Sequence, residues 1–113
     1  ERNAWRIVMV SDRPCQAECQ TQLDTLHRVW LSRGRHTERI DLLWFAEVPA
    51  TRPEFKGFIA MQPNATLQAA LPEKESAAGY PVYLIDPDGF VALHYPAGFD
   101  PSGLRKDLAK LVK

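Results

Sequence analysis

The sequence lacks an excess of charge of either sign, and it lacks long apolar runs. Its 113 residues carry 14 Lys and Arg against 14 Asp and Glu, so the formal net charge is zero. A balanced chain without a basic block argues against nucleic acid as a partner. The longest apolar runs, such as Ile7–Val10 and Leu42–Ala46, are far too short to cross a bilayer. The chain starts at Glu1 rather than Met, so we expect it to be the globular part of a longer, membrane-anchored or secreted protein.

Cysteine is scarce, since the chain holds only Cys15 and Cys19. Two cysteines do not by themselves fix the redox compartment. They follow the apolar run Trp5–Val10 and open a helical pattern, which places the first sulfur near a helix N-terminus. Free N–H groups and the helix dipole there favour the thiolate, which is both a nucleophile and a metal ligand. We therefore predict that Cys15 has the lower thiol pKa. Cys19 lies one turn further on, where it can close a disulfide or share a metal ion with Cys15.

The first half of the chain predicts a β-α-β unit. Trp5–Val10 and Ile40–Phe45 are apolar runs typical of buried strands. The segment Ala17–Arg33 between them has helical periodicity, and Gly34 is a suitable residue to end that helix. Arg35–Arg39 is expected to be a polar connection. The buried stripe of the helix is expected to contain Cys19, Leu23, Leu26 and Trp30.

The second half predicts a loop, a short helix, a hairpin and a last helix. Ala46–Lys56 is punctuated by proline and is expected to be a loop, and Ala65–Leu71 a short helix. Val82–Ile85 and Phe90–Tyr95 are expected to pair around the turn Asp86–Gly89. Apolar side chains are expected to tuck under the loop, namely Phe55, Phe58, Ile59 and Met61. The last helix is expected to be capped by Asp100, to start at Pro101 and to bury Leu104, Leu108 and Leu111.

The order of these elements resembles the thioredoxin-like layout. The fold class is therefore predicted to be α/β, with a central mixed sheet of about four strands flanked by helices. The C-terminal β-hairpin is followed by a helix. We expect residues 1–113 to form a single thioredoxin-like domain and to be monomeric.

Three segments carry a more specific resemblance. Pro14–Leu23 looks like a Cys-x-x-x-Cys-Pro-Thr-x-Leu signature, although Gln20 replaces its proline. Glu47–Glu54 lies where an Asp-Pro-x-x-Asp loop is expected, and Tyr83–Gly89 is similar to a Tyr-Leu-Ile-x-Pro-x-Gly hairpin. With these segments the chain resembles the Sco/SenC group of thioredoxin-like proteins, which assist assembly of the copper site of cytochrome oxidase. The resemblance implies copper-site or disulfide-bearing protein partners and a location on the periplasmic or extracytoplasmic face of the inner membrane.

The chain departs from this family where a copper ligand is expected. Copper-binding members use the two cysteines and a His just before the Tyr-Leu-Ile strand. The corresponding segment here is Ala77–Val82, and no His occurs between His36 and His94. Pro81 instead stands directly before the strand, where redox-active thioredoxins carry a cis-proline. We therefore predict a cis Tyr80–Pro81 bond packed beside the cysteine pair.

Three functions remain open. The preferred one is a thiol–disulfide oxidoreductase that needs no cofactor, in which Cys15 attacks, Cys19 resolves and Pro81 helps to hold the target. The second is a Cu(I)-binding chaperone with Cys15 and Cys19 as ligands and His94 as a candidate third ligand. The third is a redox-inert domain that uses the same fold to dock a partner.

Overall fold

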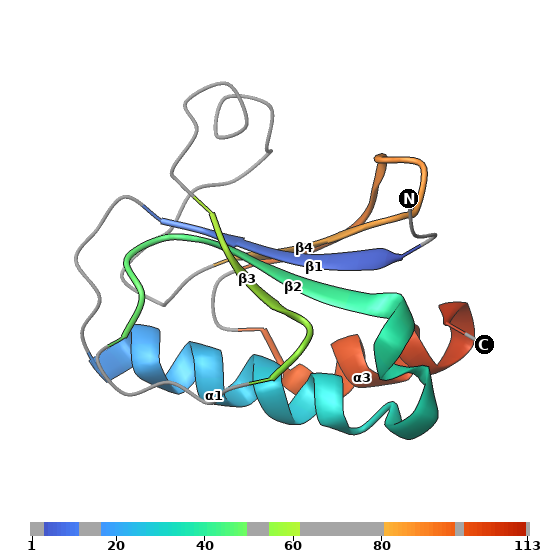
Figure 1. Cartoon of the computed structure of the whole chain (residues 1–113), viewed down its shortest axis with the longest axis horizontal. Coiled ribbons are helices and arrows are strands. Elements are labelled where there is room, and N and C mark those ends of the chain that lie inside the picture. Colours follow the sequence, from blue (N-terminus) through green and yellow to red (C-terminus); the bar gives the residue numbers. More distant parts are fainter. Residues whose placement is uncertain (1–3, 12–16, 50–54, 62–80, 97–98, 113) are drawn as a thin grey trace.

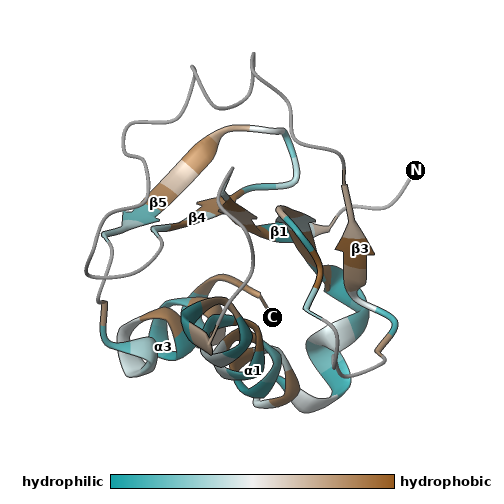
Figure 2. Cartoon of the chain, turned by 90° about the vertical axis from the view of Figure 1, so that its left-hand side faces the viewer, coloured by the Kyte–Doolittle hydropathy of each residue, from teal (hydrophilic) through white to brown (hydrophobic). Residues whose placement is uncertain are grey.

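The protein is an α/β structure in which a mixed sheet packs on two helices (Figures 1 and 2). The computed structural model describes residues 4–11, 17–49, 55–61, 81–96 and 99–112. The elements in chain order are β1 (Trp5–Val10), α1 (Ala17–Leu31), the 3-10 helix η1 (Gly34–Arg39), β2 (Ile40–Phe45), β3 (Phe58–Ala60), β4 (Val82–Ile85), β5 (Val91–Tyr95) and α3 (Pro101–Leu111). The predicted helix Ala65–Leu71 lies outside the described residues.

The sheet has the order β3-β2-β1-β4-β5, with β1 at its centre. β1 pairs in parallel with β2, and β2 with β3, whereas β4 runs antiparallel to both β1 and β5. α1 carries the chain from the end of β1 back to the start of β2, as a parallel pair requires. The β-α-β unit and the C-terminal hairpin predicted from the sequence are both confirmed.

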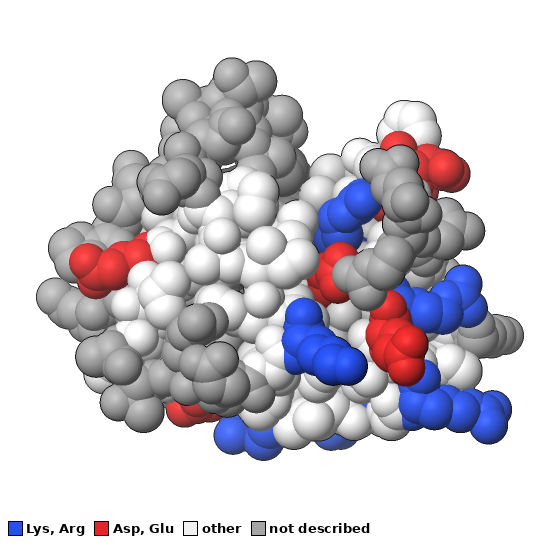
Figure 3. Space-filling model, viewed as in Figure 1, with Lys and Arg blue, Asp and Glu red and all other residues white. Residues whose placement is uncertain are grey.

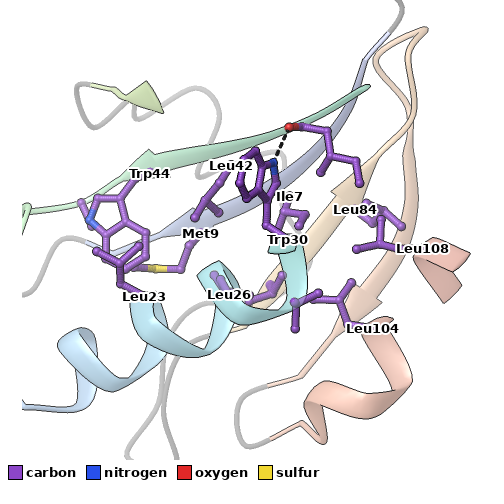
Figure 4. Close-up of a cluster of buried hydrophobic side chains, with 14 of the residues drawn as sticks. Ile7, Met9, Leu23, Leu26, Trp30, Leu42, Trp44, Leu84, Leu104 and Leu108 are labelled. Atoms are coloured by element: carbon purple, nitrogen blue, oxygen red, sulfur yellow. Dashed lines mark hydrogen bonds between the residues drawn. The ribbon is translucent and has the colours of Figure 1, made fainter. Parts of the chain in front are cut away.

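The main core lies between the sheet and the helices α1 and α3 (Figures 2 and 4). The apolar stripe predicted for α1 is buried, because it faces alternate side chains of β1, β2 and β4. Fully burying one such Leu contributes about 1.5–3 kcal/mol. Residues of this core include Ile7, Met9, Cys19, Leu23, Leu26, Trp30, Leu42, Trp44, Leu84, Leu104 and Leu108. A second cluster, formed by Val8, Val10, Phe45 and Tyr83, occupies the other face of the sheet.

Local hydrogen bonds confirm the predicted turn and helix cap. The Asp86 carboxylate accepts hydrogen bonds from the N–H groups of Asp88 and Phe90, at 3.0 and 2.9 Å. Gly89 has a φ of +97°, a conformation that glycine adopts at little cost. The Asp100 side chain accepts from the Ser102 N–H at 3.0 Å and so caps α3, in which Pro101 is the first residue.

The sheet has five strands, not the four predicted, because Phe58–Ala60 forms an edge strand. The Leu42 N–H donates to the Gly57 carbonyl at 2.7 Å, and the Met61 N–H donates to the Trp44 carbonyl at 2.8 Å. The prediction that Ile59 and Met61 tuck under a loop is wrong, since they are 36% and 40% exposed. A three-residue strand is too short to show an alternating pattern in the sequence.

The ends of several elements also differ from the prediction. α1 ends at Leu31. The Ser32 hydroxyl donates to the Val29 carbonyl at 2.6 Å, and that carbonyl would accept a backbone N–H if the helix continued. The expected polar connection is the helix η1, which Gly34 enters with a φ of +55°. Leu111 is 41% exposed, because Val112 reaches the core in its place. No helix in the described ranges is long and apolar enough to cross a membrane.

Candidate functional site

The predicted cysteine site lies where β1 leads into α1 (Figure 1). Cys19 sits on the first turn of α1, belongs to the main core and is only 2% exposed. It is disulfide-bonded and not a free thiol. Cys15 is the only other cysteine of the chain and lies outside the described residues. The structure therefore places a protected, oxidised sulfur at the start of α1, and the attacking role of Cys15 stays a prediction.

The carbonyl oxygen of Glu47 lies against Cys19. Its distance from the Cys19 Sγ is 3.9 Å. The same oxygen accepts a hydrogen bond of 2.9 Å from the indole N–H of Trp44. Trp44 is fully buried near the end of β2, so its indole fixes the position of the oxygen. The segment after β2 thus supplies a polar backbone atom to the sulfur of a residue that belongs to the main apolar core.

Pro81 lies at the same end of the sheet. It is buried and stands directly before β4. β4 pairs antiparallel with β1, with Val82 opposite Met9, so continuing this register sets Pro81 beside Val10. The predicted neighbourhood of the first strand and the strand after Pro81 is confirmed. The predicted cis bond involves Tyr80, which lies outside the described residues, as does most of the segment Ala77–Val82.

His94 lies on the other face of the sheet from Cys19. It is opposite Tyr83 in the β4–β5 pairing, and the two rings stack with their centroids 5.0 Å apart. Tyr83 belongs to the cluster of Val8, Val10 and Phe45, whereas Cys19 belongs to the core beneath the sheet. The structure brings His94 and Cys19 to opposite faces. Among the described residues, no group of three His, Cys, Asp or Glu side chains is placed to hold a metal ion.

His27 is held in an aromatic cluster further along α1. Its ring stacks on Phe55 at a centroid distance of 4.2 Å and lies 6.2 Å from the Trp30 ring. Burial lowers the pKa of His27, while the carboxylate of Asp24 acts in the opposite direction. This cluster belongs to the packing of α1 against the loop before β3.

A cavity of about 340 Å³ lies at the other end of the sheet. It is lined by Trp30, Thr37, Glu38, Asp41, Lys56 and Gly57. Asp41 is the second residue of β2, whereas Glu47 follows the end of that strand. The cavity is therefore separate from the cysteine site.

Trp44 is the site residue that the sequence analysis did not identify. Its apolar neighbours in Ile40–Phe45 mark it only as a core residue of a strand. The Cys19–Glu47 contact that gives it a further role joins residues 28 positions apart. No local pattern in the sequence signals such a contact.

Comparisons with known proteins agree with this architecture. A family model described as "Transmembrane-like, thioredoxin-like, C-terminal domain" matches residues 5–113. A search of curated protein sequences gave no match.

Several solved structures share the fold. Trgpx in its apo form has a TM-score of 0.67 and 12% identity over 98% of this chain and 82% of that chain. Copper-bound ScoI of Bradyrhizobium japonicum has a TM-score of 0.63 and 16% identity, with coverages of 96% and 85%. BsSco, a Sco-family cytochrome c oxidase assembly protein with a disulfide switch, has a TM-score of 0.66 and 12% identity, with coverages of 96% and 80%. Peroxiredoxins are also among the similar structures. The predicted thioredoxin-like fold is confirmed.

Proposed function

The chain belongs to the family of transmembrane-like, thioredoxin-like C-terminal domains, and we propose that it acts as a thiol–disulfide oxidoreductase through Cys15 and Cys19. The observation that carries this proposal is the disulfide-bonded Cys19 on the first turn of α1. An i to i+4 disulfide closes a very short loop and contributes little stability through chain entropy. Such a bond is therefore better suited to reversible redox exchange than to stabilising the fold.

The two cysteines have different roles in the proposed exchange. The thiolate of Cys15 attacks one sulfur of a target disulfide, which breaks the target S–S bond and forms a mixed disulfide. The released target sulfur takes up a proton. Cys19 then gives up its proton and attacks the Cys15 sulfur, which forms the Cys15–Cys19 disulfide and releases the second target thiol. Two electrons and two protons have passed to the target, and the same steps in reverse oxidise a target dithiol.

The burial of Cys19 supports its role as the resolving residue. At 2% exposure, its sulfur is shielded from external disulfides and within reach mainly of a partner on its own chain. Pro81, buried directly before β4, has no backbone N–H to donate at this position. We propose that the backbone before it pairs with an extended target segment, in the manner of an added strand.

Copper delivery is the second function suggested by the resemblance to Sco proteins, one of which is copper-bound ScoI. The described residues do not supply the expected third ligand, because His94 stacks on Tyr83 on the face of the sheet opposite Cys19.

The target, the location and the assembly state are also proposals. BsSco is a cytochrome c oxidase assembly protein with a disulfide switch, which supports cysteines of copper-site assembly partners as targets. We propose that the domain works as a membrane-tethered monomer on the extracytoplasmic face. The described surface over β2 and β3 is mostly uncharged (Figure 3), and the nearby Val48 and Met61 are 36% and 40% exposed. Such a surface suits a neutral target segment better than a strongly charged one.

The test is reduction of a protein disulfide, such as those of insulin, driven by dithiothreitol. The Cys15→Ser variant is expected to lose the catalysed rate. The Cys19→Ser variant is expected to accumulate a mixed disulfide, visible as a band on a non-reducing gel. His94→Ala is the matched control and should leave the rate unchanged. Unchanged rates in both cysteine variants would contradict the proposal and favour a redox-inert docking domain.

A further inference from the structure

We propose that Trp44 is a positioning residue for the redox couple, because its indole N–H holds the Glu47 carbonyl oxygen where the reduced Cys19 S–H can donate to it. This inference rests on the proposed function and adds a residue to it. Trp44 acts through the backbone carbonyl of Glu47, to which its indole donates.

The indole is held from several sides. Trp44 is fully buried, and its carbonyl accepts the Met61 N–H at 2.8 Å, which ties β2 to the end of β3. Its ring packs against Phe58 with a centroid distance of 6.2 Å. In Figure 4 the Trp44 side chain lies over the start of α1, beside Leu23. A donor fixed in this way keeps the oxygen 2.9 Å from the indole nitrogen and 3.9 Å from the Cys19 sulfur.

The consequence depends on the redox state. In the disulfide, the Cys19 sulfur carries no proton and can only contact the oxygen. Reduction by two electrons and two protons cleaves the S–S bond and leaves one proton on each sulfur. The S–H of Cys19 is a weak donor, and the Glu47 carbonyl is then its acceptor. The dithiol form therefore gains an interaction that the disulfide form lacks.

The same oxygen opposes negative charge on Cys19. The negative end of the carbonyl dipole faces the sulfur of the buried Cys19, in a part-buried contact where such interactions are less screened than in water. It therefore favours the thiol over the thiolate at this residue. This supports a division of roles in which Cys15 attacks first and Cys19 gives up its proton only in the resolving step.

The chain offers a matched control for testing the role of Trp44. Trp30 is another buried tryptophan of the same core, and its indole N–H donates to the Ile40 carbonyl at 2.8 Å (Figure 4). This hydrogen bond lies at the start of β2, away from Cys19. Trp44→Phe and Trp30→Phe each remove one indole–carbonyl hydrogen bond and a similar side-chain volume. Only the bond lost in Trp44→Phe involves the carbonyl that contacts Cys19.

The experiment measures the dithiol–disulfide equilibrium against glutathione, with the redox forms separated by mass after alkylation. Two glutathione molecules reduce one protein disulfide and leave one glutathione disulfide, so the reaction is balanced. We expect Trp44→Phe to lower the dithiol-to-disulfide ratio about threefold, a potential about 14 mV more negative. Trp30→Phe should not change the ratio. Replacing Trp44 by benzothienylalanine keeps the ring shape, removes only the donor and should reproduce the shift even if Trp44→Phe folds poorly.

The outcomes separate this inference from the proposed function. Equal ratios for the wild type, the benzothienylalanine variant and Trp30→Phe would overturn the role of Trp44 while leaving the exchange reaction in place. A shift of the same size in both Trp→Phe variants would show a general packing effect and would also overturn it. A cysteine pair that exchanges with neither glutathione nor dithiothreitol would refute the proposed function itself.

Discussion

Gly57→Ala is expected to destabilise the protein although it adds only one methyl group. Gly57 precedes β3, and its carbonyl accepts the Leu42 N–H at 2.7 Å, so its backbone is held close to β2. A Cβ at this position would lie 2.5 Å from the Trp30 Nε1, 2.8 Å from its Cε2 and 3.0 Å from the Ile40 carbonyl oxygen. These distances are well inside van der Waals contact. Either β3 must move away from β2, or the Trp30 indole must leave its place.

The expected change in the free energy of unfolding is the sum of three contributions. Overpacking of a filled core costs about 1–3 kcal/mol. Displacing the indole also lengthens its hydrogen bond to Ile40, which costs about 1 kcal/mol more. The lower entropy of the unfolded chain returns about 0.4–1 kcal/mol when Ala replaces Gly. We expect a net loss of about 2 kcal/mol in the free energy of unfolding.

Urea denaturation followed by far-UV circular dichroism measures this loss. With a slope of about 2 kcal/mol per molar urea, the midpoint should fall by about 1 M. Gly103→Ala is the control, since no atom lies within 4 Å of its added Cβ on α3, and it should gain about 0.5–1 kcal/mol. Trp30→Phe should relieve the clash, so the double variant with Gly57→Ala should be more stable than additivity predicts. A Gly57→Ala variant within 0.5 kcal/mol of the wild type would refute the close packing described.

Four further predictions concern the site and one helix cap. In the reduced single-cysteine variants, the Cys15 thiol should alkylate faster than the Cys19 thiol, which is only 2% exposed; equal rates in iodoacetamide assays would contradict the role assignment. The reduced protein should hold Cu(I) weakly in a chelator competition, and Ala78→His should raise its affinity; tight wild-type binding would speak against this. Pro81→Ala should slow exchange with protein disulfides more than with small ones, as compared by insulin and glutathione assays. Hydrogen bonds from Ser102 lower the pKa of Asp100, so its contribution is present above the unfolded pKa of about 3.9 and is lost as pH falls through the lower folded value. The stability gap between the wild type and Asp100→Ala should therefore shrink in acid, and a gap independent of pH would contradict this reading.

Local rules in the sequence were sufficient for most of the elements. The apolar run Trp5–Val10, the stripe through Leu23 and Leu26, and the turn Asp86–Gly89 each depend on residues close together in the chain. The same holds for the cap of α3, where Asp100 and Ser102 are two positions apart. Periodicity, turn chemistry and capping act over one or two turns, so the sequence alone determines them.

The tertiary structure decided the features that depend on distant residues. β3 is a strand only because β2 supplies hydrogen-bond partners to Gly57 and Met61. Val112 is buried in place of Leu111 at the end of α3, where the side chain of Arg33, which lies between α1 and η1, donates to the Val112 carbonyl at 3.1 Å.

The cysteine site also combines features that are visible in the sequence with features that depend on the tertiary structure. A Cys-x-x-x-Cys pair at a strand–helix junction is visible in the sequence, and so is a proline before a later strand. The separation of His94 from Cys19 depends on which face of the sheet each occupies, which follows from the strand register and the packing of α1. The contact of the Glu47 carbonyl with both Trp44 and Cys19 exists only once β2 has docked on α1, because backbone oxygens carry no sequence signature and reach their partners through the fold.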